Sequence, residues 1–469
     1  MEDDSLIRRL ISIVGDDHVV AGAAGEQWLT DWRGRYRGEA IAVVFPGTTE
    51  EVAEVVCACV AADVAIVPQG GNTGLCGGAT PLSGGRSVVI NLSRMKRVRA
   101  VDAANNALVV EAGCTLAAVQ QAADQHDRLF PLSLASEGTC EIGGNLSTNA
   151  GGVQVLRYGN MRELVLGVEV VLPDGRVWDG LRALRKDNTG YDLKQLFIGA
   201  EGTLGIVTAV VLKLFPKPRA RATAWVDVPD PAAAVGLLRA VQSRCGDRVT
   251  AFEIIGREAL QLVLKNIPDA RPPFAEPGAW GVLLELSDMI SAEGLNGLLE
   301  VALGEAFEAG LARDAVVAQS GAQAEALWAL RENISEAQRI EGVSIKHDIA
   351  VPVSRVPEFL AQAGQALTAR WPDTRIVAFG HIGDGNLHYN LSKADALENR
   401  DFIARTPDIN RVVHDLVDAL GGSISAEHGL GQLKREEITR YRSEVELEMM
   451  RALKRTFDPQ GRMNPGKVV

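Results

Sequence analysis

Short apolar runs alternate with amphipathic stretches through the first half of the chain, and the alternation predicts strands and helices in turn. The run IAVVFP at 41–46 predicts a short strand. Thr48 and Glu51 then have the spacing of a capping box, which predicts that a helix begins there. A second strand is predicted for VAIVP at 64–68, and a β-hairpin with a Pro-Asp-Gly turn for 164–179.

A break in this pattern at Pro216–Pro218 predicts a domain boundary, because proline and charge interrupt the alternation. Beyond it, residues 223–244 and 280–288 predict strand, helix and strand of a second α+β unit. A helix is also predicted at 444–457. We therefore expect an α+β protein in four parts: 1–37, 38–217, 218–425 and 426–469.

Composition narrows the function classes. The 469 residues are 46% hydrophobic and 23% charged, as in ordinary globular proteins. A net charge of -12 argues against binding nucleic acid or an anionic membrane through the overall field. No apolar run reaches the length of a membrane span, the acidic start is unlike a signal peptide, and six cysteines in so long a chain do not make a disulfide framework. We expect a cytoplasmic enzyme with reduced thiols.

Three glycine-rich stretches follow predicted strands in the first half: residues 68–78, 136–152 and 199–205. Gly, Asn and Thr allow backbone N–H groups to converge on an anion without obstruction from side chains. A single such stretch is more typical of turns that need a positive φ. Three of them, in a chain without GxGxxG or GxxxxGK[ST], favour a large phosphate-bearing cofactor held by another fold.

Two histidines lie seven positions apart in FGHIGDGNLHYN at 379–390. On a helix His381 and His388 would be about 10 Å apart, and on one strand they would face opposite sides. A two-residue turn at Asp384-Gly385 would instead place His381 directly opposite His388, close enough to share an ion. Asn390 would lie on the same strand face as His388. The alternative is that hairpin histidines only form hydrogen bonds.

A glutamate and a histidine, Glu427 and His428, are adjacent in SAEHG at 425–429. Two imidazoles and one carboxylate leave an open position on a zinc-like ion, so we expect His381, His388 and Glu427 to bind a divalent metal, with zinc favoured. The ordinary pKa of an imidazole suits a general base at neutral pH, which predicts a catalytic role for His428.

Several motifs resemble a known family. PQGGNTGL, IGGNLSTNAGG and GYDLKQLFIGAEGTLGIVT resemble the flavin-binding loops of the vanillyl-alcohol oxidase superfamily. GHIGDGNLH, SAEHG and FDPQGRMNPGK resemble its FAD-linked D-2-hydroxyacid dehydrogenase branch. The resemblance runs from about residue 38 to the end of the chain.

The resemblance implies a two-subdomain FAD-binding domain of the vanillyl-alcohol oxidase type at 38–217, an α+β substrate (cap) domain at 218–425, and a C-terminal helical segment at 426–469 that packs back on the FAD-binding domain. It also implies a cofactor site. Asn72 stands where some members have the histidine that bonds covalently to flavin, so the FAD is expected to be non-covalent. The implied FAD-binding residues are Pro68, Gly70, Gly71, Asn72, Thr73, Gly74, Leu75, Gly138, Thr139, Gly143, Gly144, Asn145, Thr148, Asn149, Glu201, Gly202, Ile206, Val207 and Asn464.

The family resemblance also implies a substrate pocket. Arg331, Ser335 and Lys346 match an Arg, a hydroxyl residue and a Lys that bind substrate in members of the hydroxyglutarate type, and we add Asn390. Arg331 and Ser335 are four apart and would share a helix face. Without the resemblance, a solvated face with Arg331 paired to a nearby glutamate is favoured.

Two cations suit a dicarboxylate, because an unpaired buried ammonium is costly. The expected reaction is therefore oxidation of D-2-hydroxyglutarate to 2-oxoglutarate, with D-malate second. A hydride would pass from C2 to the flavin while His428 takes the hydroxyl proton, and a carbanion route is the alternative.

Other functions stay open at this point. Within the family, a D-lactate dehydrogenase or a glycolate oxidase subunit is the second hypothesis. A metal-dependent hydrolase that uses His381, His388 and Glu427 is a hypothesis from another class, and a non-catalytic flavin-binding protein is a third. The electron acceptor, an electron-transferring flavoprotein or a quinone among others, is not indicated by the sequence. A homodimer is expected, although no motif fixes the oligomeric state.

Overall fold

The computed structural model describes residues 2–394 and 397–469. They form two compact units. Unit 1 comprises Met1–Gly152, Gly159–Lys217 and Glu427–Val469, and unit 2 comprises Val153–Tyr158 and Pro218–Ala426. The C-terminal segment therefore belongs with the N-terminal half of the chain. The short segment Val153–Tyr158 belongs to unit 2, a placement that the hydrophobic pattern did not predict.

Unit 1 contains a four-stranded and a five-stranded sheet, with strand orders β1-β2-β4-β3 and β5-β6-β10-β8-β9. The strands of the first are β1 Val19–Ala21, β2 Ala42–Val44, β3 Ala65–Gln69 and β4 Ser87–Asn91. Those of the second are β5 Val98–Asp102, β6 Ala107–Glu111, β8 Val165–Val171, β9 Val177–Gly180 and β10 Ile206–Lys213, and β7 Arg128–Leu129 pairs with β11 Phe215–Pro216. In the first sheet β2, β4 and β3 are parallel, whereas the second sheet is antiparallel throughout.

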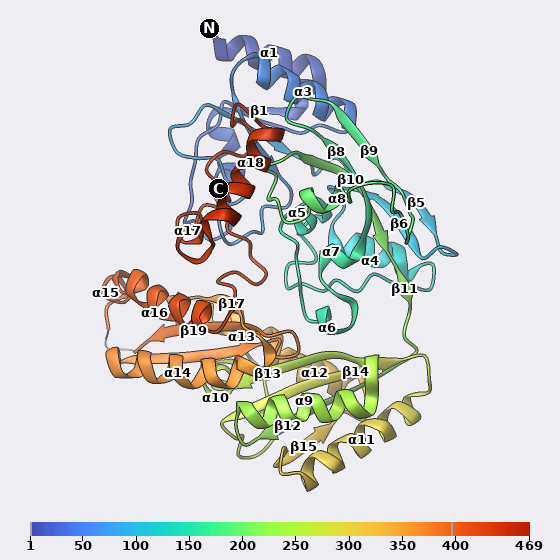
Figure 1. Cartoon of the computed structure of the whole chain (residues 1–469), viewed down its shortest axis with the longest axis vertical. Helices are drawn as coiled ribbons and strands as arrows, with labels where there is room; N and C mark the ends of the chain where they lie inside the picture. The colour runs from blue at the N-terminus through green and yellow to red at the C-terminus, as the bar shows by residue number, and fades with distance from the viewer. Residues whose placement is uncertain (1, 395–396) are drawn as a thin grey trace. The chain divides into compact units, whose positions relative to one another are not determined.

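Helices cover the four-stranded sheet of unit 1. α1 Glu2–Val14 and α3 Thr49–Ala61 lie side by side against its strands (Figure 1). The remaining helices of this unit are α2 Glu26–Leu29, α4 Leu116–Asp124, α5 Ile142–Ser147, α7 Met161–Leu164, α8 Lys194–Phe197, α17 Ile438–Tyr441 and α18 Glu444–Phe457. The core under α1 and α3 is aliphatic, with Leu10, Val55 and Ile66 among its fully buried members.

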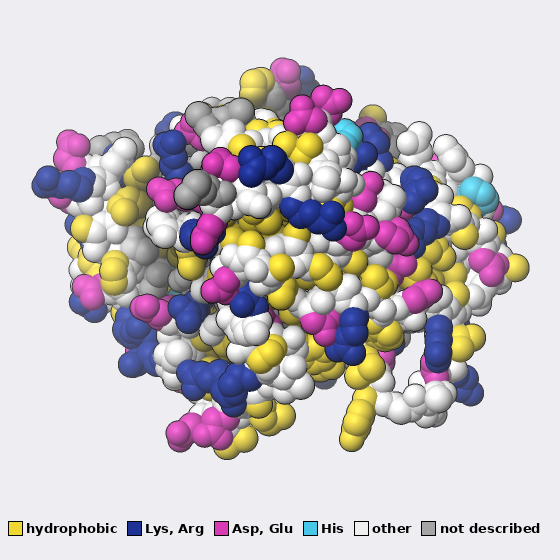
Figure 2. All heavy atoms as spheres, turned by 90° about the horizontal axis from the view of Figure 1, so that it is seen from above, with side chains coloured by type: hydrophobic (Ala, Val, Ile, Leu, Met, Phe, Trp, Pro, Cys, Tyr) yellow, Lys and Arg dark blue, Asp and Glu magenta, His cyan; other side chains and the backbone are white. Residues whose placement is uncertain are grey.

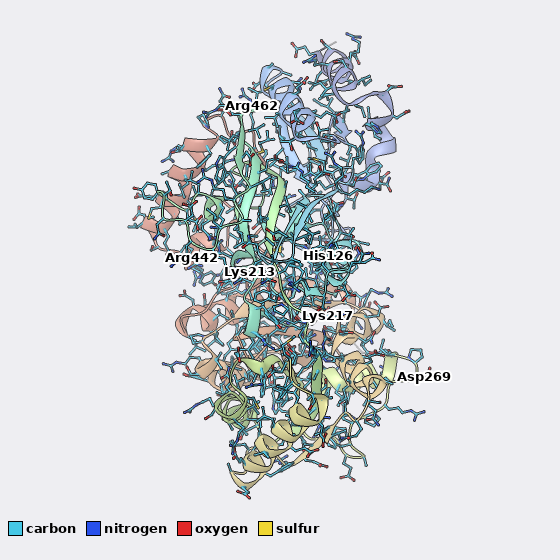
Figure 3. The ribbon with its side chains drawn as sticks, turned by 90° about the vertical axis from the view of Figure 1, so that its right-hand side faces the viewer. His126, Lys213, Lys217, Asp269, Arg442 and Arg462 are labelled. Carbon is cyan, nitrogen blue, oxygen red and sulfur yellow. The ribbon has the colours of Figure 1, made fainter. Side chains whose placement is uncertain are left out.

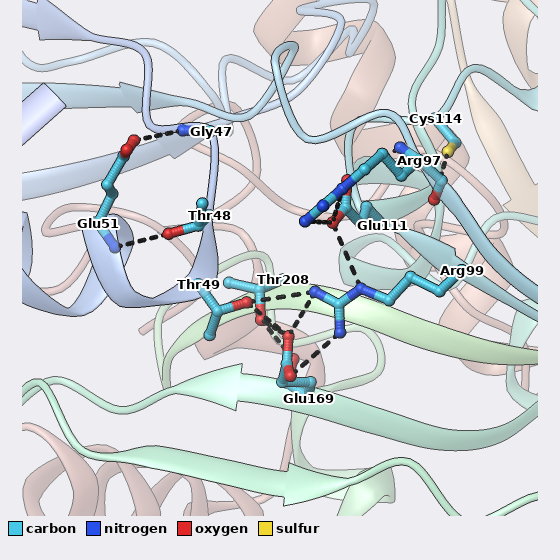
Figure 4. Close-up of polar contacts among 10 residues, drawn as sticks. All are labelled: Gly47, Thr48, Thr49, Glu51, Arg97, Arg99, Glu111, Cys114, Glu169 and Thr208. Atoms are coloured by element: carbon cyan, nitrogen blue, oxygen red, sulfur yellow. Dashed lines mark hydrogen bonds and ion pairs between the residues drawn. The ribbon is translucent and has the colours of Figure 1, made fainter. Parts of the chain in front are cut away.

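Two local predictions for unit 1 are confirmed. Thr48 caps α3 by accepting a hydrogen bond from the backbone N–H of Glu51, while the Glu51 carboxylate accepts from the Gly47 N–H (Figure 4). The Pro-Asp-Gly turn joins β8 to β9, with Val171 opposite Val177 and Gly175 at φ 85°. Both signals are short in sequence, and their bonds form within a few residues.

A buried ion-pair network joins α3 to the five-stranded sheet. Arg99 pairs with Glu111 and Glu169, and Glu169 also accepts hydrogen bonds from the hydroxyls of Thr49 and Thr208 (Figure 4). Burial alone would raise the pKa of Glu169, but these donors hold it below its ordinary value. The network therefore holds the first turn of α3 against the second sheet.

Unit 2 is built on a sheet of eight strands in the order β15-β12-β14-β13-β18-β19-β16, with β17 paired to β19. Its strands are β12 Ala220–Val228, β13 Val249–Gly256, β14 Trp280–Asp288, β15 Asp314–Val317, β16 Ser344–Ile345, β17 Asp348–Ala350, β18 Thr374–Gly380 and β19 Asn386–Lys393. Its helices are α6 Val155–Tyr158, α9 Pro231–Cys245, α10 Arg257–Asn266, α11 Ala292–Glu308, α12 Gly321–Glu332, α13 Ile334–Glu341, α14 Val356–Arg370, α15 Asn399–Ala404 and α16 Thr406–Ala419. α9 and α11 pack side by side on the sheet (Figure 1), and α10, α12 and α13 share a separate core cluster with Trp225 and Phe379.

Charged side chains of both signs occur at the surface. On the face drawn in Figure 2, acidic and basic side chains are interspersed over apolar surface. Lys217, labelled in Figure 3, is the last residue of the Gly159–Lys217 segment of unit 1 and forms an ion pair with Asp124. Within the described residues, no helix is both long and apolar enough to cross a membrane.

Candidate active site

The glycine-rich stretches line one cavity in unit 1. The atom-free space between the lining residues, its open mouth included, is about 920 Å³. Every residue expected to bind FAD lines this cavity except Leu75, Gly138, Thr139, Asn149 and Asn464. His428 lines it as well. The expected cofactor loops and the expected base thus meet within one unit.

Close backbone approach explains Gly71 in the first loop. A Cβ on Gly71 would lie 2.1 Å from the backbone oxygen of Thr139, so only glycine allows the first and second loops to touch there. Asn72 and Asn149 have φ values of 52° and 51°, and the Asn72 amide donates to the backbone oxygen of Thr30. The loops therefore contain turns with a positive φ and also line a shared cavity. The two interpretations of the glycine-rich stretches, as turns and as a cofactor site, are compatible.

The C-terminal segment is tied to this cavity by Glu201 and Asn464. The Glu201 carboxylate accepts hydrogen bonds from the N–H groups of Leu430 and Gly431, at 2.7 and 2.8 Å. The Asn464 amide donates to the backbone oxygens of Gly78 and Glu201. Burial raises the pKa of Glu201, and the two backbone donors oppose that rise. These bonds hold the segment that carries His428 beside the cavity.

Several features of the cavity fit an FAD molecule. Its walls are backbone-rich loops, as a pyrophosphate group requires. One carboxyl oxygen of Glu141, which lines the cavity, is buried without a hydrogen-bond partner. Sequence reasoning missed Glu141, although the residue lies inside the second glycine-rich stretch, because a carboxylate is not an expected neighbour of a phosphate.

The connection between β18 and β19 differs from the expected two-residue turn. Phe379, not His381, is opposite His388, and residues 381–385 form the connection. The Asp384 carboxylate accepts from the Asn386 N–H, and β19 is also paired with β17, where Asp348 is opposite His388. The register is therefore set by three strands and not by the turn alone.

The two imidazoles of unit 2 nevertheless lie together. The ring centroids of His381 and His388 are 5.8 Å apart, with nearly perpendicular planes. Asp384 Oδ2 lies 4.0 Å from His381 Nδ1, and Asp348 Oδ1 lies 4.0 Å from His388 Nδ1. Burial, and then the nearby charge of Arg331, lower the pKa of His381 to about 3, so its ring is neutral, which is the form that binds metals. The donor set fits a divalent ion of the zinc type.

Glu427, the third expected metal ligand, belongs to unit 1. There its Oε1 accepts a hydrogen bond from the Gly152 N–H at 2.7 Å. The preceding residue, Ala426, donates its N–H to the backbone oxygen of Asp348, which is opposite His388.

Arg331 is buried and paired, whereas the sequence predicted a solvated face in the absence of the family resemblance. Its Nε donates to Glu253 Oε2 at 2.6 Å, and its guanidinium lies over the Phe379 ring at 4.8 Å. Glu253 is fully buried, and its other oxygen lies 3.8 Å from His381 Nε2. The predicted partners were glutamates nearby in sequence, but the actual partner is 78 residues away.

Ser335 does not share a helix face with Arg331, which corrects the sequence prediction. α12 ends at Glu332 and α13 begins at Ile334, with Asn333 between them at ψ 0°. Ser335 is exposed, whereas Arg331 is buried. The helix ends here because the Asn333 side chain bonds back to the Ala329 carbonyl, a local alternative to helical continuation.

The other expected substrate residues lie near β19. Lys346 is half-buried in the link between β16 and β17. Asn390 accepts a hydrogen bond from the His347 N–H and donates to Gln338. Both ring nitrogens of His347 are bonded, one to the Tyr389 carbonyl and one to Asn410.

Comparisons with known proteins agree with this architecture. Residues 217–468 match the family model described as FAD linked oxidases, C-terminal domain, and residues 40–180 match that of an FAD binding domain. The chain is 38% identical to a D-2-hydroxyglutarate dehydrogenase of Xanthomonas citri pv. viticola, over 94% of this chain and 92% of that one. It is 37% identical to a D-2-hydroxyglutarate dehydrogenase of Stutzerimonas stutzeri over 100% and 99%, and 38% identical to the mitochondrial protein of that name from Bos taurus over 94% and 78%.

Two solved structures share the fold. The structure of p-cresol methylhydroxylase with substrate bound superposes with a TM-score of 0.78 at 18% identity, covering 100% of this chain and 96% of that one. That of an alkyldihydroxyacetonephosphate synthase gives 0.76 at 19% identity, over 98% and 86%. The expected fold class is thereby confirmed. The chain belongs to the family of FAD-linked oxidases, in the branch that contains these D-2-hydroxyglutarate dehydrogenases.

Proposed function

We propose that this enzyme oxidises D-2-hydroxyglutarate to 2-oxoglutarate with non-covalently bound FAD and a divalent metal. The observation that carries the proposal is the position of His428, which lines the same cavity as the glycine-rich loops. The names of the curated relatives support the substrate, and D-malate is the second choice because it is also a D-2-hydroxy dicarboxylate. Asn72 supports a non-covalent flavin, because an amide cannot form the bond that a histidine makes.

The protein groups have distinct tasks in this proposal. His428 accepts the proton of the C2 hydroxyl, a role for which an imidazole is the side chain most often used. When bound, FAD accepts two electrons with the C2 hydrogen, and a divalent ion held by His381, His388 and Glu427 makes the hydroxyl more acidic. Glu201 holds the backbone just after His428 and so restricts the position of the base.

Substrate charge is matched by the cations of unit 2. Arg331 uses Nε for Glu253, which leaves its two terminal nitrogens to face a carboxylate in the fork geometry that suits arginine. Lys346 is proposed to bind the second carboxylate, and Asn390 completes the proposed set. Glu253 offsets the charge of Arg331, so Lys346 carries more of the preference for a dicarboxylate over D-lactate or glycolate.

An anaerobic screen of D- and L-2-hydroxy acids tests the proposal. D-2-hydroxyglutarate is expected to bleach the flavin fastest, with D-malate slower and the L-isomers inactive. Removing the metal with a chelator should slow bleaching without releasing FAD, and re-added zinc should restore it. A purified protein without flavin that hydrolyses substrates would support the metal-hydrolase hypothesis instead, and equal bleaching by D-lactate would contradict the dicarboxylate pocket.

A further inference from the structure

Glu141 lies between the two loops that line the FAD cavity. It follows the second loop's first turn, pairs through its backbone with Thr115, and immediately precedes α5. Its side chain points against the first loop, since a Cβ placed on Gly70 would lie 3.3 Å from Glu141 Oε2 and 3.7 Å from the N of Gly144. Glu141 is 6% exposed and lines the cavity.

This carboxyl group differs from the other buried carboxylates of the unit. Glu111 and Glu169 pair with arginines, and Glu201 accepts two backbone N–H groups. Among the described residues, no basic side chain pairs with Glu141, and its Oε2 is buried without a hydrogen-bond partner. A buried ionised carboxylate without partners is strongly disfavoured. Burial accordingly raises the pKa of Glu141 to about 8, so the group is a neutral carboxylic acid at neutral pH.

A neutral carboxyl group is a hydrogen-bond donor, and a pyrophosphate is a strong acceptor. An ionised carboxylate at the same place would repel the phosphates. Resting on the FAD cofactor of the proposed function, we propose that Glu141 donates a hydrogen bond from its carboxylic acid to a phosphate oxygen of FAD, so that ionisation of Glu141 weakens FAD binding.

The proposal fixes the direction of the pH dependence. Because the protonated form binds FAD, affinity is highest below the pKa of Glu141 and falls as the pH rises through it. With that pKa at about 8, the dissociation constant is expected to be nearly constant from pH 6 to 7 and about thirtyfold larger at pH 9.5. ADP-ribose, which carries the pyrophosphate, should compete with the same pH dependence, whereas riboflavin, which has no phosphate, should bind independently of it.

Equilibrium titration of the full-length apoprotein with FAD, followed by flavin fluorescence from pH 6 to 9.5, tests this. Glu141→Gln keeps a donor and cannot ionise, so its affinity should stay close to the neutral-pH value at every pH. Glu141→Ala removes the donor and should bind FAD more weakly than wild type at pH 7. Glu137→Gln is a matched control, because Glu137 lies four residues earlier, is half-buried, and accepts a hydrogen bond from Gln120. It should retain the pH dependence of the wild type.

A wild-type affinity that does not change with pH, or a pH dependence that persists in Glu141→Gln, overturns the role of Glu141. Equal pH dependence for riboflavin overturns the assignment to a phosphate. Circular dichroism of each variant checks that it folds. Failure of the proposed function gives a different result. A protein that binds no FAD at any pH, or whose bound FAD is reduced by no 2-hydroxy acid, contradicts the proposed function, whatever the pH dependence of FAD binding.

Discussion

The pair of Glu253 and Arg331 links the proposed anion site to the imidazole pair. One Glu253 oxygen accepts from Arg331, and the other lies 3.8 Å from His381 Nε2. Both side chains are nearly excluded from water. A buried ion pair stabilises a fold little, but removal of one partner leaves the other charge unpaired in a medium that solvates it poorly.

Glu253→Ala is therefore expected to lower the free energy of unfolding of unit 2 by about 3–5 kcal/mol. The double variant Glu253→Met with Arg331→Met should be less destabilised, because no buried charge is left. Urea unfolding followed by tryptophan fluorescence measures both. A double variant less stable than Glu253→Ala would show that the pair holds the unit together by more than mutual neutralisation.

Lys346 is the residue proposed to set the preference for a second carboxylate. Lys346→Ala should raise the KM for D-2-hydroxyglutarate about tenfold or more, the loss expected for one charged hydrogen bond, and should change the KM for D-lactate little. Lys265→Ala is the control, because Lys265 is an exposed lysine of unit 2 paired with Glu341. Unchanged selectivity between D-2-hydroxyglutarate and D-lactate in Lys346→Ala would refute this assignment.

Sequence reasoning succeeded at single residues where the cause was local. The Thr48 cap depends on a residue three positions away, so its spacing alone predicts it. Arg331 bonds to a residue 78 positions away, and no nearby spacing indicates this partner. Glu141 was missed for a chemical reason, since its raised pKa depends on burial that only the fold creates.

The hairpin of β18 and β19 shows the same limit for whole elements. The Asp384-Gly385 pair does turn the chain, and Gly385 has the expected positive φ of 84°. The register differs because β17 pairs with the other edge of β19 and because the Asp384 side chain binds the Asn386 N–H. The residues that favour a turn can be recognised in the sequence, but a strand register that depends on three paired strands cannot be predicted from it.

Gly385→Ala should disrupt this element. A Cβ there would lie 2.0 Å from the Val351 carbonyl, in addition to the cost of a positive φ, about 1–3 kcal/mol. We expect a lower melting temperature and less than half of the wild-type metal content by elemental analysis, because the imidazoles are positioned by this connection.

Gly364→Ala is the matched control for that change. Gly364 lies inside α14 with no atom within 4 Å of an added Cβ, so alanine should leave metal content unchanged and stabilise the helix slightly. Normal metal content in Gly385→Ala would show that this turn is not needed to position the proposed metal ligands.

At the scale of the whole molecule, the family motifs carried more information than the hydrophobic pattern. They implied a two-subdomain FAD-binding domain, and unit 1 has two separate sheets, of four and five strands. The pattern did not predict that residues 153–158 belong to unit 2. The unit to which this segment belongs depends on packing between segments that are distant in sequence, and the local hydrophobic periodicity does not report such packing.

The central claim is that His428 acts as the base beside FAD. Its most direct test is anaerobic single-turnover reduction of the flavin by D-2-hydroxyglutarate, in wild type and in His428→Ala, with FAD and metal contents measured on the same samples. His126→Ala is the control, because His126, labelled in Figure 3, is exposed and does not line the cavity. We expect His428→Ala to keep both cofactors and to reduce flavin at least about a hundredfold more slowly, while His126→Ala behaves as wild type. Reduction by fully loaded His428→Ala at the wild-type rate would contradict the account.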